Sequence, residues 1–156
     1  MIWIFDLDHT VVDSTHRAID GVTPSAFLRD WVTHSEEQIL ADSLLPLGKI
    51  MRHLIENDEQ VLICTARNMR AADYKLLDNL GINCKVVISR LKGDDRKDAE
   101  YKYSRLSEYL QKAKILGQEI IFFDDKFEIR EKVKTLGITC FDPKVFNGEN
   151  QVVRIH

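Results

Sequence analysis

Long apolar runs, paired cysteines and an excess of positive charge are all missing from this sequence of 156 residues. No apolar run approaches the roughly 18 residues of a membrane span, and no basic, Leu-rich leader for secretion opens the chain. The three cysteines have neither paired nor zinc-ligand spacing, which favours buried free thiols and a cytoplasmic location. A net charge of −3 gives no general attraction for nucleic acid, so a polyanion would need a local basic cluster.

What the sequence does contain is a regular alternation of apolar strands and amphipathic helices. Two helices end in Leu-Gly-Ile, at 80–82 and 136–138, where glycine suits the left-handed position that closes a helix. Such strand–helix–strand repeats predict right-handed crossovers and one α/β domain, with helices on both faces of a parallel sheet. The predicted strands are residues 1–5, 60–64, 84–88, 119–123 and 138–141.

One segment, residues 11–44, does not follow this alternation. It contains at most two short helices, which we expect over 25–32 and 36–40. That is too little for an independent cap domain. We therefore expect a single domain over 1–156 in which this segment forms a flap or small lid.

Two aspartates, Asp6 and Asp8, directly follow the first predicted strand, whose residues 2–5 are all apolar. Ligands of open α/β sheets bind beyond the carboxyl ends of the strands. Two carboxylates held this close repel each other, and a hard divalent cation with oxygen ligands, most simply Mg²⁺, would relieve the repulsion. A solvated acidic turn is the alternative for this motif on its own.

Further polar side chains lie at the ends of later elements and favour phosphoryl transfer. Thr65 follows the second strand, Asp124 and Asp125 follow the run 119–123, and Lys102 lies on the helix before that run. One carboxylate can attack phosphorus while a second protonates the leaving oxygen. A hydroxyl and an ammonium can neutralise the phosphoryl oxygens, and further carboxylates can complete a metal site.

In this order, the motifs resemble those of the haloacid dehalogenase (HAD)-like phosphohydrolase superfamily. Its D-x-D-x-[TV] motif matches residues 6–10, and its later hydroxyl, lysine and acidic-pair motifs match Thr65, Lys102 and residues 124–125. The resemblance covers nearly the whole chain and implies a three-layer, Rossmann-like α/β fold with a central parallel sheet and a minimal cap. His9 departs from the pattern, because many members have glycine there.

The resemblance also implies the role of each residue. Asp6 would be the nucleophile that carries an aspartyl-phosphate, Asp8 the general acid and base, and Thr65 and Lys102 the other catalytic residues. Thr10 would contact the substrate. The implied Mg²⁺ ligands are Asp6, the backbone carbonyl of Asp8, Asp124 and, in support, Asp125.

A narrower resemblance links residues 93–102 to the G-D-x-R-K-D-x-x-x-K pattern in the 3′-phosphatase half of phage-type polynucleotide kinase/phosphatase. Asp98 stands one helical turn before Lys102 and can orient its ammonium, while Lys97 is a competing cation. Arg17 and Arg67 match arginines of that family that could grip phosphate. No G-x-x-x-x-G-K-[ST] loop is present, so the kinase half is absent.

The sequence therefore predicts a Mg²⁺-dependent phosphomonoesterase whose first candidate substrate is the 3′-phosphate end of a nucleic acid, as in nucleic acid repair. A nucleotidase for free mononucleotides and a catalytically inactive HAD-like interaction domain are the alternatives. A receiver domain is disfavoured because its phospho-acceptor follows the middle strand of the chain and its lysine follows the last one. We expect no membrane partner, and the oligomeric state is not indicated.

Overall fold

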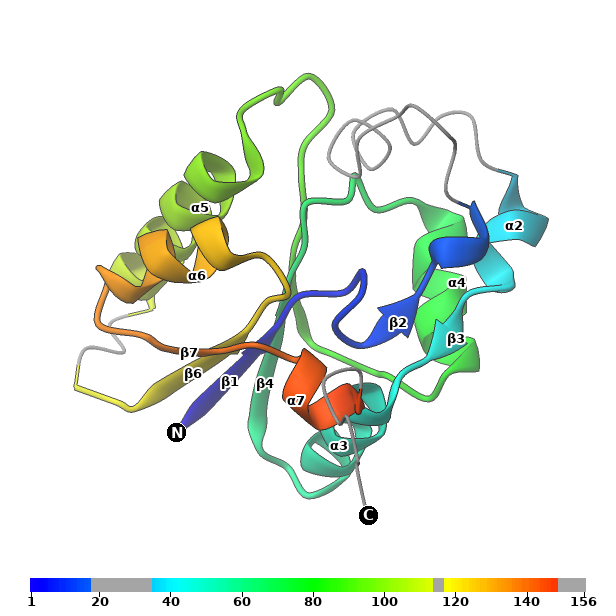
Figure 1. Ribbon diagram of the computed structural model, residues 1–156, viewed down its shortest axis with the longest axis horizontal. Coiled ribbons are helices and arrows are strands. Elements are labelled where there is room, and N and C mark those ends of the chain that lie inside the picture. The colour runs from blue at the N-terminus through cyan, green and yellow to red at the C-terminus, as the bar shows by residue number, and fades with distance from the viewer. Residues whose placement is uncertain (18–34, 114–116, 149–156) are drawn as a thin grey trace, which may run out of the picture.

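A five-stranded parallel sheet forms the centre of the computed structural model, which describes residues 1–17, 35–113 and 117–148 (Figure 1). The strand order is β5-β4-β1-β6-β7, so the first strand of the chain lies in the middle of the sheet. This confirms the predicted α/β fold and its five strands. The strands are β1 (Ile2–Phe5), β4 (Gln60–Cys64), β5 (Val86–Ile88), β6 (Ile120–Phe123) and β7 (Thr139–Phe141).

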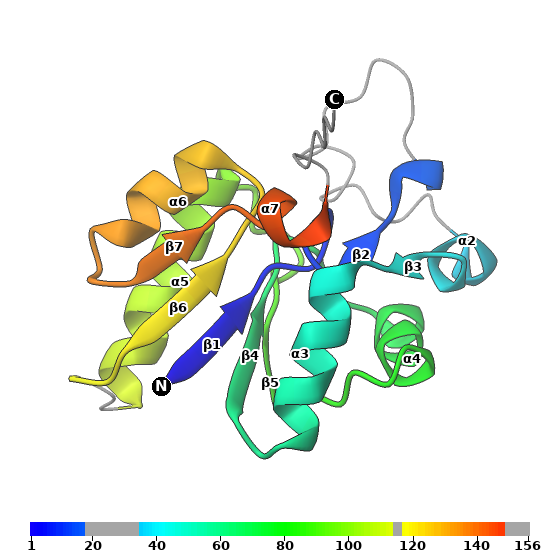
Figure 2. The same ribbon diagram turned by 60° about the horizontal axis from the view of Figure 1, so that its bottom comes forward.

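Helices cover both faces of the sheet, because alternate residues of the central strands point to opposite sides. Ile4 of β1 lies in a core with residues of α5 (Asp98–Lys112) and α6 (Phe127–Lys134). Its neighbour Phe5 lies in a second core with residues of α3 (Pro46–Glu56) and α4 (Ala71–Asn79). Figure 2 shows α5 and α6 on one side of the fanned strands and α3 on the other.

The two Leu-Gly-Ile helix ends behave as predicted. Gly81 and Gly137 adopt φ angles of 75° and 83°, in the left-handed region that residues with a side chain rarely occupy. The amide of Ile82 donates back to the carbonyl of Leu77, which closes α4 and directs the chain toward β5.

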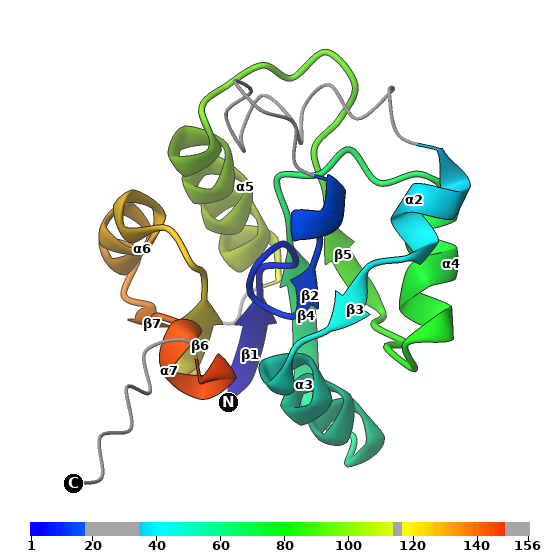
Figure 3. The same ribbon diagram turned by 45° about the vertical axis from the view of Figure 1, so that its right-hand side comes forward.

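The segment 11–44, which we expected to form a flap or small lid and which we call the flap for short, contains an antiparallel pair of short strands in its described part. These are β2 (Val12–Asp13) and β3 (Ser43–Leu44), which Figure 3 shows beside α2 (Glu36–Leu40). The predicted helix over 36–40 is confirmed and begins with a capping box at Ser35. The helix expected over 25–32 lies outside the described residues. So does the side chain of Arg17, which ends the 3₁₀ turn η1 (Thr15–Arg17).

A short last helix, α7 (Lys144–Asn147), anchors the turn that follows β1. The amide of Asn147 donates to the carbonyl of Thr10 at 3.0 Å, and its side-chain oxygen accepts from the backbone N–H of Leu47 at 2.8 Å. Neither this helix nor its contacts were predicted from the sequence. No helix among the described residues is long and apolar enough to cross a membrane.

Candidate active site

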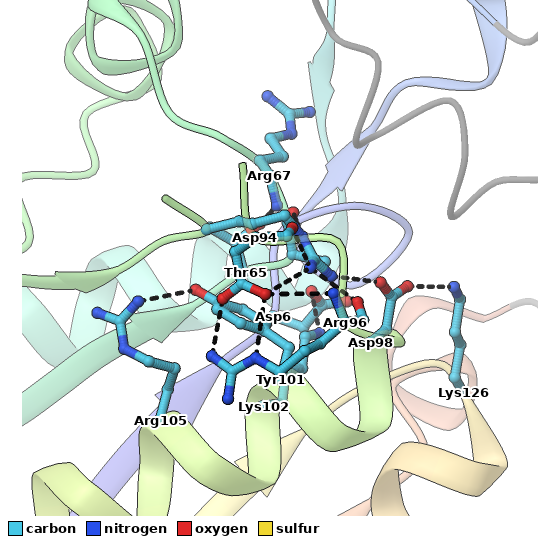
Figure 4. Close-up of polar contacts among 12 residues, drawn as sticks. Asp6, Thr65, Arg67, Asp94, Arg96, Asp98, Tyr101, Lys102, Arg105 and Lys126 are labelled. Carbon is cyan, nitrogen blue, oxygen red and sulfur yellow. Dashed lines mark hydrogen bonds and ion pairs between the residues drawn. The ribbon is translucent and has the colours of Figure 1, made fainter. Parts of the chain in front are cut away.

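The carboxyl ends of three adjacent strands bring Asp6, Thr65 and Asp124 together, and Figure 4 shows Asp6 and Thr65 beside Lys102. All three residues are buried, with Asp6 5% exposed and the other two fully covered. Since β1 lies between β4 and β6, the parallel register places these strand ends side by side. A shallow cavity of about 20 Å³ lies here, with Asp6, Asp8 and Lys102 in its lining.

The turn after β1 directs its two aspartates toward different partners. The carbonyl of Leu7 accepts from the backbone N–H groups of Thr10, Val11 and Val12, which folds residues 7–12 into a tight loop. His9 takes a φ of 61°, which places it in the left-handed region that favours glycine. As a result Asp6 faces Lys102, whereas the Asp8 carboxylate faces Arg67.

Lys102 links the first and last acidic motifs. Its ammonium donates to Asp6 at 2.8 Å and to Asp124 at 2.5 Å, although the side chain is only 2% exposed. Burial lowers the pKa of Lys102, but the charges of Asp124 and Asp6 outweigh it and raise that pKa well above the usual range. The lysine is therefore a permanent cation at the strand ends.

One cation does not balance the carboxylates around it. Asp6, Asp124 and Asp125 have ligand oxygens within 4.8 Å of one another. Burial and the charge of Asp6 raise the pKa of Asp124 to about 6 and that of Asp125 to about 8. Three close carboxylates that share one lysine make an oxygen-only site short of positive charge, which fits a hard divalent cation. We call these three residues and Lys102 the acidic cluster.

Two threonines border the acidic cluster. The hydroxyl of Thr10 donates to the second carboxylate oxygen of Asp6 at 3.0 Å, so both oxygens of Asp6 have partners. The hydroxyl oxygen of Thr65 accepts from the backbone N–H of Arg67 at 3.0 Å, which leaves its O–H available as a donor. Thr65 is thereby fixed with a donor at the strand ends, where a phosphoryl oxygen would need one.

A second buried charge cluster lies beneath the flap, and its centre is Arg67. The guanidinium donates two hydrogen bonds to Asp8, at 2.7 and 2.5 Å, and one each to Asp42 and Asp73, both at 2.9 Å. The hydroxyl of Ser14 donates to Asp8 as well, at 2.8 Å. We call Arg67 with its three carboxylates the arginine cluster; all four side chains are at most 4% exposed.

Within the arginine cluster the pKa values of the carboxylates shift in different directions. Burial raises the pKa of Asp8, but the charge and hydrogen bonds of Arg67 and the Ser14 hydroxyl outweigh it and lower that pKa to about 2. Burial also raises the pKa of Asp73, and there it prevails over the opposing charge of Arg67. In Figure 4 the Arg67 side chain extends away from Asp6 and Thr65. The guanidinium that we expected at a substrate phosphate is engaged by carboxylates.

The loop between β5 and α5 is held by a third set of ion pairs, centred on Asp98. This carboxylate accepts from Arg90 at 2.8 Å and from Lys126 at 2.9 Å. Figure 4 marks the contact between Asp98 and Lys126. Asp98 also lines the small cavity, while the hydrogen bonds of Lys102 go to Asp6 and Asp124. We expected Asp98 to orient Lys102, but Asp6 and Asp124 at the strand ends accept its hydrogen bonds instead.

The two arginines of this loop are engaged by nearby groups, while Lys92 and Lys97 are exposed. Arg90 is 3% exposed and also donates to the backbone carbonyls of Ala66, Asp94 and Arg96. Arg96 pairs with the Asp94 carboxylate. Lys97 is exposed at the start of α5 and is not part of the cavity lining. The segment is thus a braced loop of mixed charge, and its arginines do not form an open basic patch.

Several residues at the site were not predicted from sequence. Asp42 and Ser14 come from the flap and Asp73 from the first turn of α4, where its second oxygen accepts from the Arg70 backbone N–H. An acid three residues into a helix is a recognisable capping signal, but nothing in the spacing points Asp73 to Arg67. Lys126 directly follows the acidic pair, contacts Asp98 and lines the cavity.

The comparison with protein families matches residues 1–154 to a model described as bacteriophage T5 5′-deoxynucleotidase. A comparison with curated proteins finds no similar sequence.

Among solved structures, the fold resembles a chain of the Pnkp1/Rnl/Hen1 RNA repair complex, with 20% identity and a TM-score of 0.62. That match covers 90% of this chain but 41% of the other, so this chain spans about two fifths of its length. A HAD-like hydrolase from Streptococcus pneumoniae matches with 16% identity and a TM-score of 0.63, covering 90% of this chain and 83% of that one. A magnesium complex of a HAD enzyme from Bacteroides thetaiotaomicron matches with 18% identity and a TM-score of 0.53, covering 97% and 96%. These likenesses show that the fold is HAD-like.

Proposed function

This chain belongs to the family described as bacteriophage T5 5′-deoxynucleotidase, and from that membership we propose that it removes the 5′-phosphate from deoxynucleoside monophosphates in a Mg²⁺-dependent reaction. The chain is a HAD-type phosphatase; the proposal concerns its substrate, its metal and the roles of its residues. The nucleotidase that the sequence offered as an alternative thereby moves ahead of the polynucleotide 3′-phosphatase.

The arrangement around Asp6 carries the proposed reaction. Its carboxylate ends the central strand, between the Lys102 ammonium and the Thr10 hydroxyl, with Asp124 and Asp125 within 4.8 Å. A carboxylate fixed in this way is oriented for attack on phosphorus, and the adjacent ammonium and Thr65 hydroxyl can neutralise phosphoryl oxygens. Mg²⁺ held by the three carboxylates would supply further positive charge for the phosphate.

The proposed reaction has two steps. The lowered pKa keeps Asp8 ionised in the free protein, so the reaction begins when the monoanion of the substrate phosphate passes its proton to Asp8. An oxygen of Asp6 attacks phosphorus, and the bond to the 5′ oxygen breaks with its electron pair on that oxygen, which takes the proton from Asp8. A water molecule then attacks the phosphorus of the aspartyl-phosphate and gives a proton to Asp8, and the bond to Asp6 breaks to release phosphate. Asp8 passes that proton to the departing phosphate, and both aspartates return to their starting states.

A polynucleotide 3′-phosphatase is the second candidate function. It has the support of the residue 93–102 pattern and of the fold shared with the RNA repair chain. Against it stands the pairing of Arg90 with Asp98 and of Arg96 with Asp94, since a polynucleotide site needs basic side chains that carboxylates do not neutralise.

Phosphate release from four substrates separates the candidates. We expect fastest release from thymidine 5′-monophosphate, less from uridine 5′-monophosphate and thymidine 3′-monophosphate, and least from a 3′-phosphorylated oligonucleotide. EDTA should abolish release, and Asp6→Asn should reduce it on the order of 10³-fold or more.

The matched control is Asp13→Asn, because Asp13 lies on the flap and its carboxylate accepts from Thr15. This variant should retain wild-type rates. Preference for the oligonucleotide would favour the second candidate. Release from none of the four substrates, or undiminished release by Asp6→Asn, would contradict the proposed function.

A further inference from the structure

The arginine cluster connects the flap to the residue proposed to move the proton. Asp42 immediately precedes β3 and accepts from both Arg67 and His16, the latter at 2.7 Å. Arg67 in turn holds both carboxylate oxygens of Asp8. A continuous chain of hydrogen bonds therefore runs from η1 through Asp42 and Arg67 to Asp8.

Asp73 holds the guanidinium from a different direction. It accepts from Nη1 of Arg67, while Asp42 and Asp8 share Nη2 and Asp8 also takes Nε. Asp73 itself is fixed by the Arg70 backbone N–H at 2.9 Å, in the first turn of α4. Because a guanidinium is planar and its donors point in fixed directions, three carboxylates around it determine its position and tilt.

We propose that Asp42 and Asp73 are positioning residues that place the carboxyl of Asp8 for proton transfer by holding Arg67 in register with it. The negative charges of Asp42 and Asp73 also compete with Asp8 for the same guanidinium. Removing either one leaves Arg67 to shift toward the remaining carboxylates and to carry Asp8 with it. This inference rests on the proposed role of Asp8 in the reaction.

The position of Asp8 matters most when the leaving group is poor. A nucleoside alkoxide needs a proton as its bond to phosphorus breaks, phenolate needs one less, and p-nitrophenolate leaves without one. The step up to aspartyl-phosphate formation is reported by kcat/KM, so the later hydrolysis of the intermediate does not enter. A fault in positioning therefore appears as a difference among substrates, whereas a general structural fault lowers all rates alike.

The experiment measures kcat/KM of wild type, Asp42→Asn and Asp73→Asn with thymidine 5′-monophosphate, phenyl phosphate and p-nitrophenyl phosphate. We expect each variant to lower the ratio of thymidine monophosphate to p-nitrophenyl phosphate about tenfold or more, with phenyl phosphate between them. Asp13→Asn should leave all three ratios unchanged. Because each ratio comes from one preparation, it does not depend on the fraction of correctly folded enzyme.

Equal losses on all substrates, or ratios within about twofold of wild type in either variant, would overturn the proposal. Failure of the proposed function looks different. Wild type would then not hydrolyse thymidine monophosphate. The ratio of kcat/KM for phenyl phosphate to that for p-nitrophenyl phosphate would still test the positioning of Asp8.

Discussion

The acidic cluster and the arginine cluster contain the same number of charged groups, but the pKa values of their carboxylates differ. Each has three carboxylates and one basic side chain, and all of these side chains are buried except that of Asp125, which is half-buried. In the arginine cluster the pKa of Asp8 falls to about 2 although burial raises that of Asp73, whereas in the acidic cluster the pKa values of Asp124 and Asp125 both rise, to about 6 and 8. The difference lies in how the cation meets the carboxylates.

Arginine has five N–H donors in a fixed plane, and here they reach three carboxylates that approach from different sides. Lysine is a compact charge, and its hydrogen bonds reach Asp6 and Asp124 while Asp125 crowds Asp6. The first arrangement is complete without a metal ion, and the second is not. Equal counts of charge thus produce a scaffold in one place and a candidate metal site in the other.

The largest expected effect on stability comes from removing the cation of each cluster in turn. Arg67→Met should lower the free energy of unfolding by about 3–5 kcal/mol, because Asp8, Asp42 and Asp73 lose their shared cation in a buried site. Lys102→Met should be destabilised similarly without metal, but saturating Mg²⁺ should restore about 2–3 kcal/mol of it. Urea unfolding with and without Mg²⁺ measures both effects.

The matched control for these variants is Lys75→Met, which removes an exposed ion pair with Glu36 and should change stability by less than about 1 kcal/mol. Equal rescue of Arg67→Met and Lys102→Met by Mg²⁺ would erase the proposed difference between the clusters.

An effect of intermediate size is expected in the pH dependence of stability, which should differ between the two clusters. The raised pKa values of Asp124 and Asp125 mean that the folded state binds more protons than the unfolded state, so metal-free stability should fall from about pH 4 to pH 8, by several kcal/mol. The lowered pKa of Asp8 has the opposite sign. Its contribution should be present above about pH 4 and be lost as the pH falls toward about 2.

Urea midpoints at a series of pH values, with EDTA or Mg²⁺, provide the measurement. Mg²⁺ should flatten the fall between about pH 4 and 8 and leave the acidic limb unchanged. Metal-free stability that instead rises across that range would show that the acidic cluster is not short of positive charge.

The smallest effect concerns the turn that the two clusters share. His9 has a φ of 61°, and His9→Gly should stabilise the protein by about 0.5–1 kcal/mol by relieving that conformation. Asp58→Gly is the matched control, because Asp58 has a φ of 59° after α3, away from both clusters. Thermal unfolding should show similar gains. A loss of stability in His9→Gly alone would mean that the imidazole contributes contacts that outweigh the backbone strain.

Much of the fold and of the acidic cluster could be predicted from sequence, because both follow from local patterns. Apolar runs located the five strands, and polar residues just after them necessarily meet at one edge of a parallel sheet. Asp6, Thr65, Lys102 and Asp124 are therefore found together as expected, whereas their catalytic roles stay predictions.

The arginine cluster could not be predicted, because its members are joined by tertiary contact alone. Asp42 lies 25 residues before Arg67 and on the flap, and only the fold places it beside the guanidinium. The motif pattern suggested that Arg67 is open to a phosphate. Burial among carboxylates, which no single-sequence pattern reveals, gives it a different set of partners.

The most direct test of the comparison is a titration of the metal-free protein with Mg²⁺ by calorimetry, for wild type, Asp124→Asn and Asp42→Asn. The two substitutions each remove one buried negative charge, from the acidic cluster and from the arginine cluster respectively. We predict that wild type and Asp42→Asn bind one Mg²⁺ with similar affinity, and that Asp124→Asn binds it at least about tenfold more weakly. Unchanged affinity in Asp124→Asn, or an equal loss in Asp42→Asn, would contradict the assignment of the metal to the acidic cluster.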